Sequence, residues 1–496
     1  MKPTLQFDEL HVISDLHLGG VKPFQIFGST RELVALVEYL TKITVERQVG
    51  LLINGDFIDF LAEEPSAYFD PDGAVSKLNR ILKDATFELI VDALSKFVRT
   101  KNRMLMINLG NHDLELALPW VREHLIQSLC GEDLEARGRL NIVLDGTGVL
   151  CQVGNALVLC LHGNEVDSWN VADFETIRRV GRDAQFGWPV EAWVPNAGTR
   201  MVIDVMNTIK RRFPFVDLLK PEAEAVVPTL LALDPSALPT LRDVASVAGR
   251  RAWDAARMAT GFLGDPIANT NGVISRAVEP PAAIMAGGAG RFSERGGRVR
   301  ADDELLSLME VVEIEARKGT VPMDLIKQDQ DRQLGFWGAT WKLISGKPMP
   351  EVLREALEDL DKDRSFDIEE PDDTFKRLDA LVTSNIDYVV AGHTHLERAL
   401  RRKSGRAYYF NSGTWARLIK IKKATRQDPV KFERVFNLLK GGSMEDLDKE
   451  PDLVIKRCSI VSVWTDPDGR TYGELRRMGA GQDQPQPVED SRYPRS

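Results

Sequence analysis

Five short segments rich in Asp, His, Asn and Gly each follow directly on a run of apolar residues that is typical of a buried strand. They are Ser-Asp-Leu-His at 14–17, Gly-Asp-Phe-Ile-Asp at 55–59, Gly-Asn-His-Asp at 110–113, His-Gly at 162–163 and Gly-His-Thr-His at 392–395. In layered α/β proteins, ligands bind in the loops beyond the carboxyl ends of strands. We therefore expect all five segments to converge on one edge of a sheet.

The sequence between these segments alternates between strand and helix patterns. Apolar runs at 10–14, 51–54 and 104–108 are separated by amphipathic helix patterns at 30–46 and 84–98. Strand-like sequence continues over 140–161 and returns at 386–390, 407–410, 459–465 and 471–475. Short apolar runs that alternate with helices predict an α/β fold with stacked layers.

The region 168–385 interrupts this pattern with sequence that is mostly helical and has Pro-rich joints. We therefore predict a first core part at 1–167, a helical insertion at 168–385, a second core part at 386–479 and a disordered polar tail at 480–496. The insertion leaves and re-enters the core beside the five segments. It is thus well placed to form a cap that selects the substrate.

Composition excludes some classes of protein and disfavours others. The formal net charge of -10 gives no global field that would attract nucleic acid, although a local basic groove stays open. The four cysteines form no CxxC pair, which argues against a zinc knuckle and fits a reducing compartment. No run approaches the ~20 apolar residues of a membrane span, so we expect a cytoplasmic protein without a transmembrane segment. Peripheral membrane contact stays open through the basic and aromatic cluster at 210–215.

The residue types in the five segments suit the binding of two metal ions. Imidazole and carboxylate ligands favour zinc, iron or manganese over calcium. A single carboxylate can bridge two metals about 3.5–4 Å apart, and such a pair polarises a phosphoryl oxygen and converts bound water to hydroxide. The hydroxide then attacks phosphorus in line with the leaving oxygen. Each segment is a weak signal when taken singly, and Gly-His-Thr-His is the most specific of them, but all five in this order indicate such a site.

The order of the segments resembles that of the calcineurin-like metallophosphoesterase superfamily, whose pattern is D-x-H, G-D-x-x-D, G-N-H-[DE], an isolated His and G-H-x-H. Every element is present, within residues 10–162 and 386–415. The resemblance implies a four-layer α/β fold, in which a sandwich of two β-sheets is flanked by helices. Phe60 follows the second motif where many members have Arg or Asn, which leaves the polarity of the nearby pocket open.

The resemblance also implies roles for individual residues. The first metal ion would be held by Asp15, His17, Asp56 and His395, and the second by Asp56, Asn111, His162 and His393. His112 would face the substrate, where it stabilises the phosphoryl charge or protonates the leaving oxygen, while Asp113 orients it and Asp59 acts as an outer partner. The two ions are divalent, with Mn²⁺ favoured over Fe or Zn. Glu165 and Asp167 follow His162 closely and are either outer contacts of the site or part of a solvated loop.

The motifs predict the reaction class but not the substrate. We expect hydrolysis of a phosphodiester, pyrophosphate or monoester in a phosphorylated small molecule. The opening HVISDLHLG is similar to that of the UDP-diacylglucosamine pyrophosphohydrolase branch, whose helical lid is much shorter. A nuclease of the same superfamily is one alternative. A non-catalytic metal-binding scaffold is the alternative from another class, although such proteins normally lose ligands and none is lost here.

Overall fold

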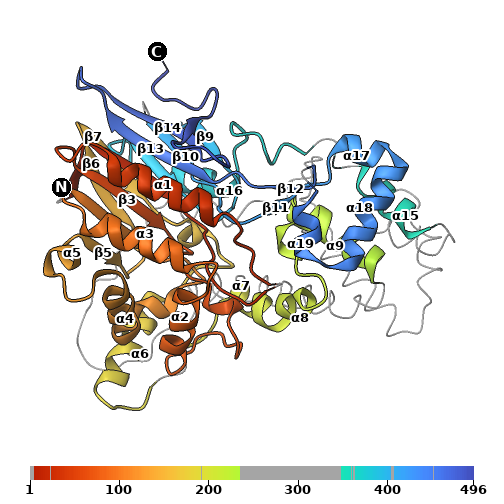
Figure 1. The fold of residues 1–496 in the computed structure, drawn as a ribbon, viewed down its shortest axis with the longest axis horizontal. Coiled ribbons are helices and arrows are strands. Elements are labelled where there is room, and N and C mark those ends of the chain that lie inside the picture. Colours follow the sequence, from red (N-terminus) through yellow and green to blue (C-terminus); the bar gives the residue numbers. More distant parts are fainter. Residues whose placement is uncertain are drawn as a thin grey trace, which may run out of the picture.

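The computed structural model describes residues 5–22, 24–190, 193–234, 348–358, 360, 363–403, 407–450 and 452–495. In these residues two β-sheets stack face to face, with helices on the outside (Figure 1). The seven-stranded sheet has the order β15-β14-β13-β2-β3-β4-β5, and the six-stranded sheet has the order β1-β6-β7-β8-β10-β9.

The strands of the seven-stranded sheet are β2 (Glu9–Ile13), β3 (Val49–Asn54), β4 (Arg103–Asn108), β5 (Leu140–Val143), β13 (Ser459–Thr465), β14 (Thr471–Arg477) and β15 (Gln486–Pro487). Those of the six-stranded sheet are β1 (Leu5–Phe7), β6 (Val149–Val153), β7 (Ala156–Cys160), β8 (Tyr388–Ala391), β9 (Arg398–Arg401) and β10 (Tyr408–Asn411). Strands β2 to β5 are parallel, as are β7, β8 and β10. The strand positions expected from the apolar runs are therefore confirmed.

The parallel strands are apolar on both faces because each face is covered. In β3, Leu52 packs between the two sheets, whereas Leu51 and Ile53 face the outer helices. In β4, Met106 packs between the sheets in the same way, and its neighbours face the helices. Successive side chains of a strand point to opposite faces, so a strand buried on both sides reads as a continuous apolar run.

Helices form the outer layers. The seven-stranded sheet is covered by α1 (Thr30–Lys42), α2 (Ala74–Leu82), α3 (Glu88–Arg99), α4 (Pro119–Cys130) and α5 (Leu134–Gly138). On the six-stranded sheet, Phe375 and Leu378 of α16 (Asp373–Leu381) pack against Val389 and Tyr409. The helix α6 (Phe174–Gln185) begins the insertion and buries Val180 in the outer core of the seven-stranded sheet. The sandwich flanked by helices predicted from the sequence is thus confirmed.

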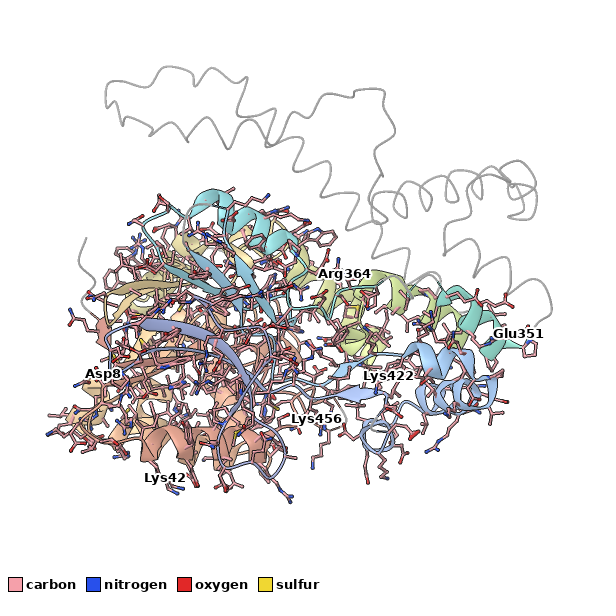
Figure 2. All side chains as sticks on the ribbon, turned by 90° about the horizontal axis from the view of Figure 1, so that it is seen from above. Asp8, Lys42, Glu351, Arg364, Lys422 and Lys456 are labelled. Atoms are coloured by element: carbon pink, nitrogen blue, oxygen red, sulfur yellow. The ribbon has the colours of Figure 1, made fainter. Side chains whose placement is uncertain are left out.

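A second, smaller core lies beside the sandwich, and we call it the helical body (Figures 1 and 2). From the insertion it takes α7 (Ala197–Arg200), the π-helix Met201–Met206, α8 (Asn207–Lys210), a 3-10 turn (Val216–Leu218), α9 (Glu222–Leu233) and α15 (Met349–Ala356). From the later sequence it takes β11 (Leu418–Ile419), α17 (Lys423–Gln427), α18 (Pro429–Gly441), α19 (Met444–Asp448) and β12 (Val454–Ile455). In Figure 2, Glu351 and Lys422 lie on this body, away from Asp8 and Lys42 on the sandwich.

The helical body alters the predicted division of the chain. Residues 418–455 stand inside the second core part expected at 386–479, yet they pack with the insertion. Phe213 and Phe215 are buried in this core, so they are not available for the membrane contact considered for the cluster at 210–215. Within the insertion the sequence predicts helices at 241–258 and 302–317 and has a Gly-rich segment at 282–297, and all three lie outside the described residues. No helix in the described ranges has the length and apolar character needed to cross a membrane.

The disordered tail predicted for 480–496 is wrong as far as residue 495. Residues 486–487 form β15 on the edge of β14, and the backbones of Gly473 and Tyr493 exchange two hydrogen bonds of 2.7 and 2.8 Å. Tyr493 is buried and stacks on Tyr408 with ring centroids 4.7 Å apart. The polar composition predicted disorder, but a few buried anchors and main-chain pairing to a sheet edge are enough to order this segment.

We predict that Tyr493→Ala lowers the free energy of unfolding by about 3 kcal/mol, the usual cost of truncating a buried aromatic side chain. Urea unfolding followed by circular dichroism measures the change. Glu489→Ala, at an exposed position four residues earlier, should leave the midpoint unchanged. Equal midpoints for the parent and Tyr493→Ala would show that the tail does not contribute to the fold.

Candidate metal centre

The ends of five strands bring the predicted ligands together. Asp15, Asp56 and Asn111 lie in the loops after β2, β3 and β4 of the seven-stranded sheet, while His162 and His393 lie in the loops after β7 and β8 of the other sheet. His17 and His395 stand two residues further along their loops. The site therefore spans the top of the sandwich. The structure gathers six of the seven predicted ligands into two clusters, and the seventh, Asn111, contacts Asn170.

Glycines in the motifs make room for ligands from neighbouring loops. A Cβ atom on Gly110 would lie 2.1 Å from the Oδ1 of Asp56, and one on Gly55 would lie 2.2 Å from the Nδ1 of His162. Gly55 also has a left-handed φ of 91°. Any larger side chain at either position would displace a ligand, which explains physically why Gly precedes the polar residues there.

One cluster consists of Asp15, His17 and His395, whose ligand atoms all lie within 4.8 Å of one another. The Nε2 of His395 lies 3.4 Å from the Oδ1 of Asp15 and 3.1 Å from the Nε2 of His17. The Asp15 carboxylate also accepts from the backbone N–H of His393 and from the Ser14 hydroxyl. These are three of the four residues expected to hold the first metal ion.

A second cluster consists of Asp56, His162 and His393. The Oδ2 of Asp56 lies 3.3 Å from the Nε2 of His162 and 3.7 Å from the Nε2 of His17 in the first cluster. Asp56 therefore stands close to a histidine of each cluster. The Nδ1 of His162 contacts the backbone oxygen of Asn54 at 2.8 Å, which directs its other nitrogen toward Asp56.

Several buried polar atoms fit the binding of cations here. The Nε2 of His162 lies 3.3 Å from the Oδ2 of Asp56 without making a hydrogen bond of good geometry, and the Oδ1 of Asn111 has no hydrogen-bond partner among the described residues, although both side chains are buried. An unsatisfied buried polar atom costs about 1–3 kcal/mol, and a metal ion would satisfy both of these atoms. Nitrogen and oxygen donors in this proportion suit manganese, iron or zinc. The residues present therefore fit a pair of metal ions.

The backbone at the site is strained in a way that also points to function. Five of the seven predicted ligands have left-handed φ angles, from 49° at His17 to 70° at His393. These five are Asp15, His17, Asp56, His393 and His395. A strained backbone of this kind costs a residue other than Gly about 1–3 kcal/mol, and it persists only where the surroundings hold it.

The carboxylates of the two clusters keep neighbouring histidines protonated at the positions where metal ions would bind. Burial alone would lower the pKa of His162, but the Asp56 carboxylate outweighs this effect and raises it to about 10. Burial opposes the ionisation of Asp15, yet contacts with His395 and His162 lower its pKa to about 2. Divalent ions would take the place of the protons on such imidazoles, because a metal ligand must be deprotonated.

His112 stands beside the clusters, with its ring 4.7 Å from that of His17. Its Nδ1 contacts the Oδ1 of Asp59 at 3.0 Å, so Asp59 orients this imidazole. The prediction that Asp113 orients it is wrong. The buried Asp113 carboxylate accepts from the backbone N–H groups of Gly110 and Phe57, and it holds the loop rather than the ring. Burial lowers the pKa of His112, but Asp59 and Asp56 outweigh burial and raise it to about 9.

The two acidic residues that follow His162 have different surroundings. Glu165 accepts from the backbone N–H groups of His162 and Gly163, so it braces the loop. Asp167 contacts the Nε2 of His393 at 2.9 Å and is therefore an outer contact of the site.

Three residues of the insertion belong to the surroundings of the site although the motifs did not indicate them. Asn170 contacts the side chain of Asn111. Lys210 acts electrostatically on His112 and Asp59, and Lys220 acts on His395. In the sequence, Lys210 stands out only as part of a basic cluster, and no pattern marks Asn170 or Lys220.

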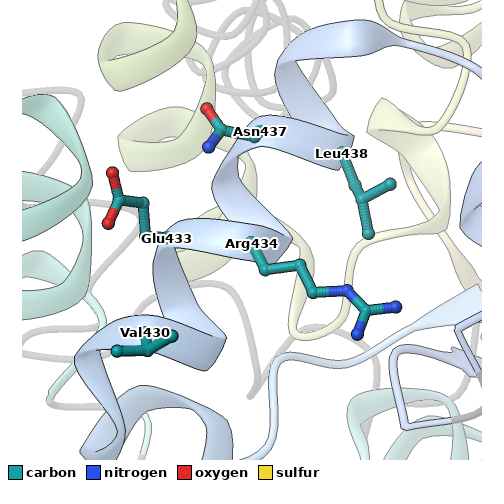
Figure 3. A pocket seen from close by; sticks show the side chains of 5 residues that line it. All are labelled: Val430, Glu433, Arg434, Asn437 and Leu438. Carbon is teal, nitrogen blue, oxygen red and sulfur yellow. The ribbon is translucent and has the colours of Figure 1, made fainter.

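A surface hollow on α18 is separate from this centre. It is lined by Val430, Glu433, Arg434, Asn437 and Leu438, which all project from this one helix of the helical body (Figure 3). None of these residues belongs to either ligand cluster.

Comparison with known proteins matched one protein-family model and no curated sequence. The family model of the calcineurin-like phosphoesterases matches residues 10–213, which include five of the seven predicted ligands, His112 and Lys210. Residues 10–213 therefore match the calcineurin-like phosphoesterase domain, the family that the motifs resemble.

Proposed function

We propose that this protein hydrolyses a phosphoester or phosphoanhydride bond with two divalent metal ions. Asp15, His17, Asp56 and His395 would hold one ion, and Asp56, Asn111, His162 and His393 the other. The observation that carries the proposal is the position of the Asp56 carboxylate, within 3.7 Å of His17 in one cluster and 3.3 Å of His162 in the other. The ions would polarise a phosphoryl oxygen and supply a water of lowered pKa as the nucleophile. Mn²⁺ is the first candidate, with Fe and Zn as alternatives.

His112 would bind the phosphoryl group and protonate the leaving oxygen. Its Nδ1 is occupied by Asp59, so its Nε2 is the nitrogen left for a substrate. With its pKa raised to about 9, the ring is protonated at neutral pH and carries a positive charge. A cationic donor held in place beside the reacting group stabilises the charge that develops in the transition state.

The described part of the insertion adds a positive charge next to His112. Asn207 donates to the backbone oxygen of Leu61 at 3.1 Å, which holds α8 against the turn that follows Asp59. Lys210, at the end of α8, is mostly buried and ion-paired with Asp217. Burial lowers the pKa of Lys210, but Asp217 and Asp59 outweigh burial and raise it, so the ammonium stays charged. We infer that the site favours a phosphorylated small molecule with a second negative charge, such as a diphosphate diester.

The two alternatives fit less well. A nuclease would need to attract a long anionic polymer, and a chain with a net charge of -10 has no global field to do this. A non-catalytic scaffold has no need of His112 and Asp59, which are placed beside the clusters in addition to the ligands.

Asp56→Asn tests the two-metal assignment. We expect hydrolysis of bis(4-nitrophenyl) phosphate in Mn²⁺ to fall roughly 100-fold or more, as when a group that stabilises the transition state is lost. Bound Mn²⁺, measured after dialysis, should fall below two per chain. Asp92→Asn, on the exposed side of α3, makes the same chemical change away from the site and should retain both properties. Undiminished hydrolysis by Asp56→Asn would refute the assignment.

Asp59→Asn tests the role of His112 through the pH profile. Without the Asp59 carboxylate the pKa of His112 falls, so protonated His112 is lost at a lower pH. The alkaline limb of kcat/KM should therefore move to lower pH, by about 1 unit or more. His112→Ala should lower activity and abolish this limb. Metal content is the control, because Asp59 also lies 3.4 Å from the Nδ1 of His17. An unmoved limb with normal metal content would exclude His112 as the proton donor.

Lys210→Met tests the inferred preference for a second negative charge. We expect KM for a diphosphate diester such as ADP-ribose to rise about 10-fold, as for the loss of one hydrogen bond to a charged group. KM for bis(4-nitrophenyl) phosphate, which has a single charge, should change much less. The neighbouring Arg211→Met removes a charge that is exposed and paired with Glu64, and it should leave both values unchanged. Equal effects of Lys210→Met on both substrates would contradict the inference.

A further inference from the structure

Asp167 connects the start of the insertion with the second cluster. Its Oδ2 contacts the Nε2 of His393 at 2.9 Å and accepts from the Nδ2 of Asn170 at 2.6 Å, while its Oδ1 accepts from the backbone N–H of Trp169 at 2.9 Å. Both oxygens of the Asp167 carboxylate thus accept from N–H donors, and a carboxylate that is used in this way offers His393 only an acceptor.

This contact decides which nitrogen of His393 is free for a ligand. A nitrogen that faces a carboxylate oxygen at 2.9 Å must carry a proton. In a neutral imidazole the other nitrogen, Nδ1, then presents its lone pair. The backbone is fixed as well, because the N–H of His393 donates to both oxygens of Asp15 at 3.0 and 3.2 Å. Asp167 thus selects Nδ1 as the atom of His393 that can bind a cation.

Asn170 in turn determines which atom of the Asn111 amide is left for a metal ion. Its amide nitrogen must face Asp167, which has only acceptors to offer, so its oxygen faces the other way. That oxygen accepts from the Nδ2 of Asn111 in a long contact of 3.4 Å. The Oδ1 of Asn111 is consequently the atom left without a partner among the described residues of the buried site. Asn170 is itself fixed, because Asn164 donates to its backbone oxygen at 3.1 Å and a Cβ on Gly198 would meet its Oδ1 at 1.9 Å.

We propose that Asp167 and Asn170 form a clamp that turns the ligand atoms of His393 and Asn111 toward the second metal ion and so sets the affinity for that ion alone. The proposal rests on the two-metal function above. Asp167 and Asn170 are positioning residues, since they act through ligands of the second ion. Their side chains bond to His393, to Asn111 and to each other, all on the side of the second cluster.

The test is calorimetric titration of the metal-free, full-length protein with Mn²⁺. The parent should bind two ions per chain. Asp167→Asn removes the negative charge and exchanges one acceptor oxygen for an amide N–H₂, so the side chain cannot keep its contacts with His393, Asn170 and the backbone N–H of Trp169 all at once. We expect the second ion to bind about 10- to 100-fold more weakly, the usual loss when an outer partner of a metal ligand is changed. Binding of the first ion should not change.

Asn170→Asp gives a second, nearly isosteric variant. It places a second carboxylate next to Asp167 and should weaken binding of the second ion to a similar extent. In the double variant Asp167→Asn with Asn170→Asp, the amide at position 167 can donate to the carboxylate at position 170. That carboxylate can still accept from the Nδ2 of Asn111, whereas the acceptor that faced His393 is lost. The double variant should therefore recover part of the lost affinity, which a general loss of structure would not do. Asp173→Asn, at the N-cap of α6 in the same stretch, should leave both ions bound as in the parent.

Three outcomes would overturn the clamp. They are binding of the second ion to Asp167→Asn with parental affinity, equal weakening of both ions in a variant whose metal-free form unfolds at the parental temperature, and a double variant that recovers nothing. A parent that binds fewer than two Mn²⁺ would overturn the two-metal function together with the clamp. A parent that binds two ions but does not hydrolyse bis(4-nitrophenyl) phosphate or ADP-ribose would overturn the proposed activity and leave the clamp standing.

Discussion

The whole site depends on the placement of a buried carboxylate, Asp56, between two groups of histidines. A carboxylate without a partner would be strongly disfavoured at a position that is 2% exposed. Here it is compensated by His162 and His17 on either side and by the backbone N–H of His112. Burial raises the pKa of Asp56, but His162 and the other imidazoles outweigh it, and the pKa lies well below its ordinary value. Protons on the histidines or divalent metal ions can each compensate the negative charge of Asp56. The carboxylate therefore makes the pocket favourable for cations before any metal ion binds.

The two-sheet sandwich provides the rigidity that this arrangement needs. Left-handed backbone at residues with large polar side chains is costly, and the loops would relax if their ends were free. Each loop instead follows a strand whose two faces are buried, and β2, β3 and β4 are held in parallel register. The oxygens of Asp15 are further fixed by Ser14 and by the N–H of His393, so that loops from both sheets brace one another. The stability of the sandwich thus holds the strained backbone of the site in place.

The sequence predicts much of this site because its ligands follow strands, and buried strands are readable from their apolar runs. The runs that became β3 and β4 are enough to place Asp56 and Asn111 at one edge of a sheet. They do not predict which carboxylate turns toward His112, since Asp59 and Asp113 are both close to that ring along the chain or in space. The choice depends on the N–H groups of Gly110 and Phe57, which capture Asp113 and leave Asp59 for the imidazole. Contacts of this kind come from loop geometry and leave no periodic signal.

The same limit applies to the insertion, whose composition indicated helices but not what they touch. Packing between residues 418–455 and the insertion joins two regions that are far apart in the sequence, and neither region shows a motif for the other. At the start of the insertion, Asp167 and Asn170 contact His393 and Asn111. Further along the insertion, Lys210 acts electrostatically on His112. Lys220, further along the insertion, acts electrostatically on His395, so different parts of the insertion act on the two clusters.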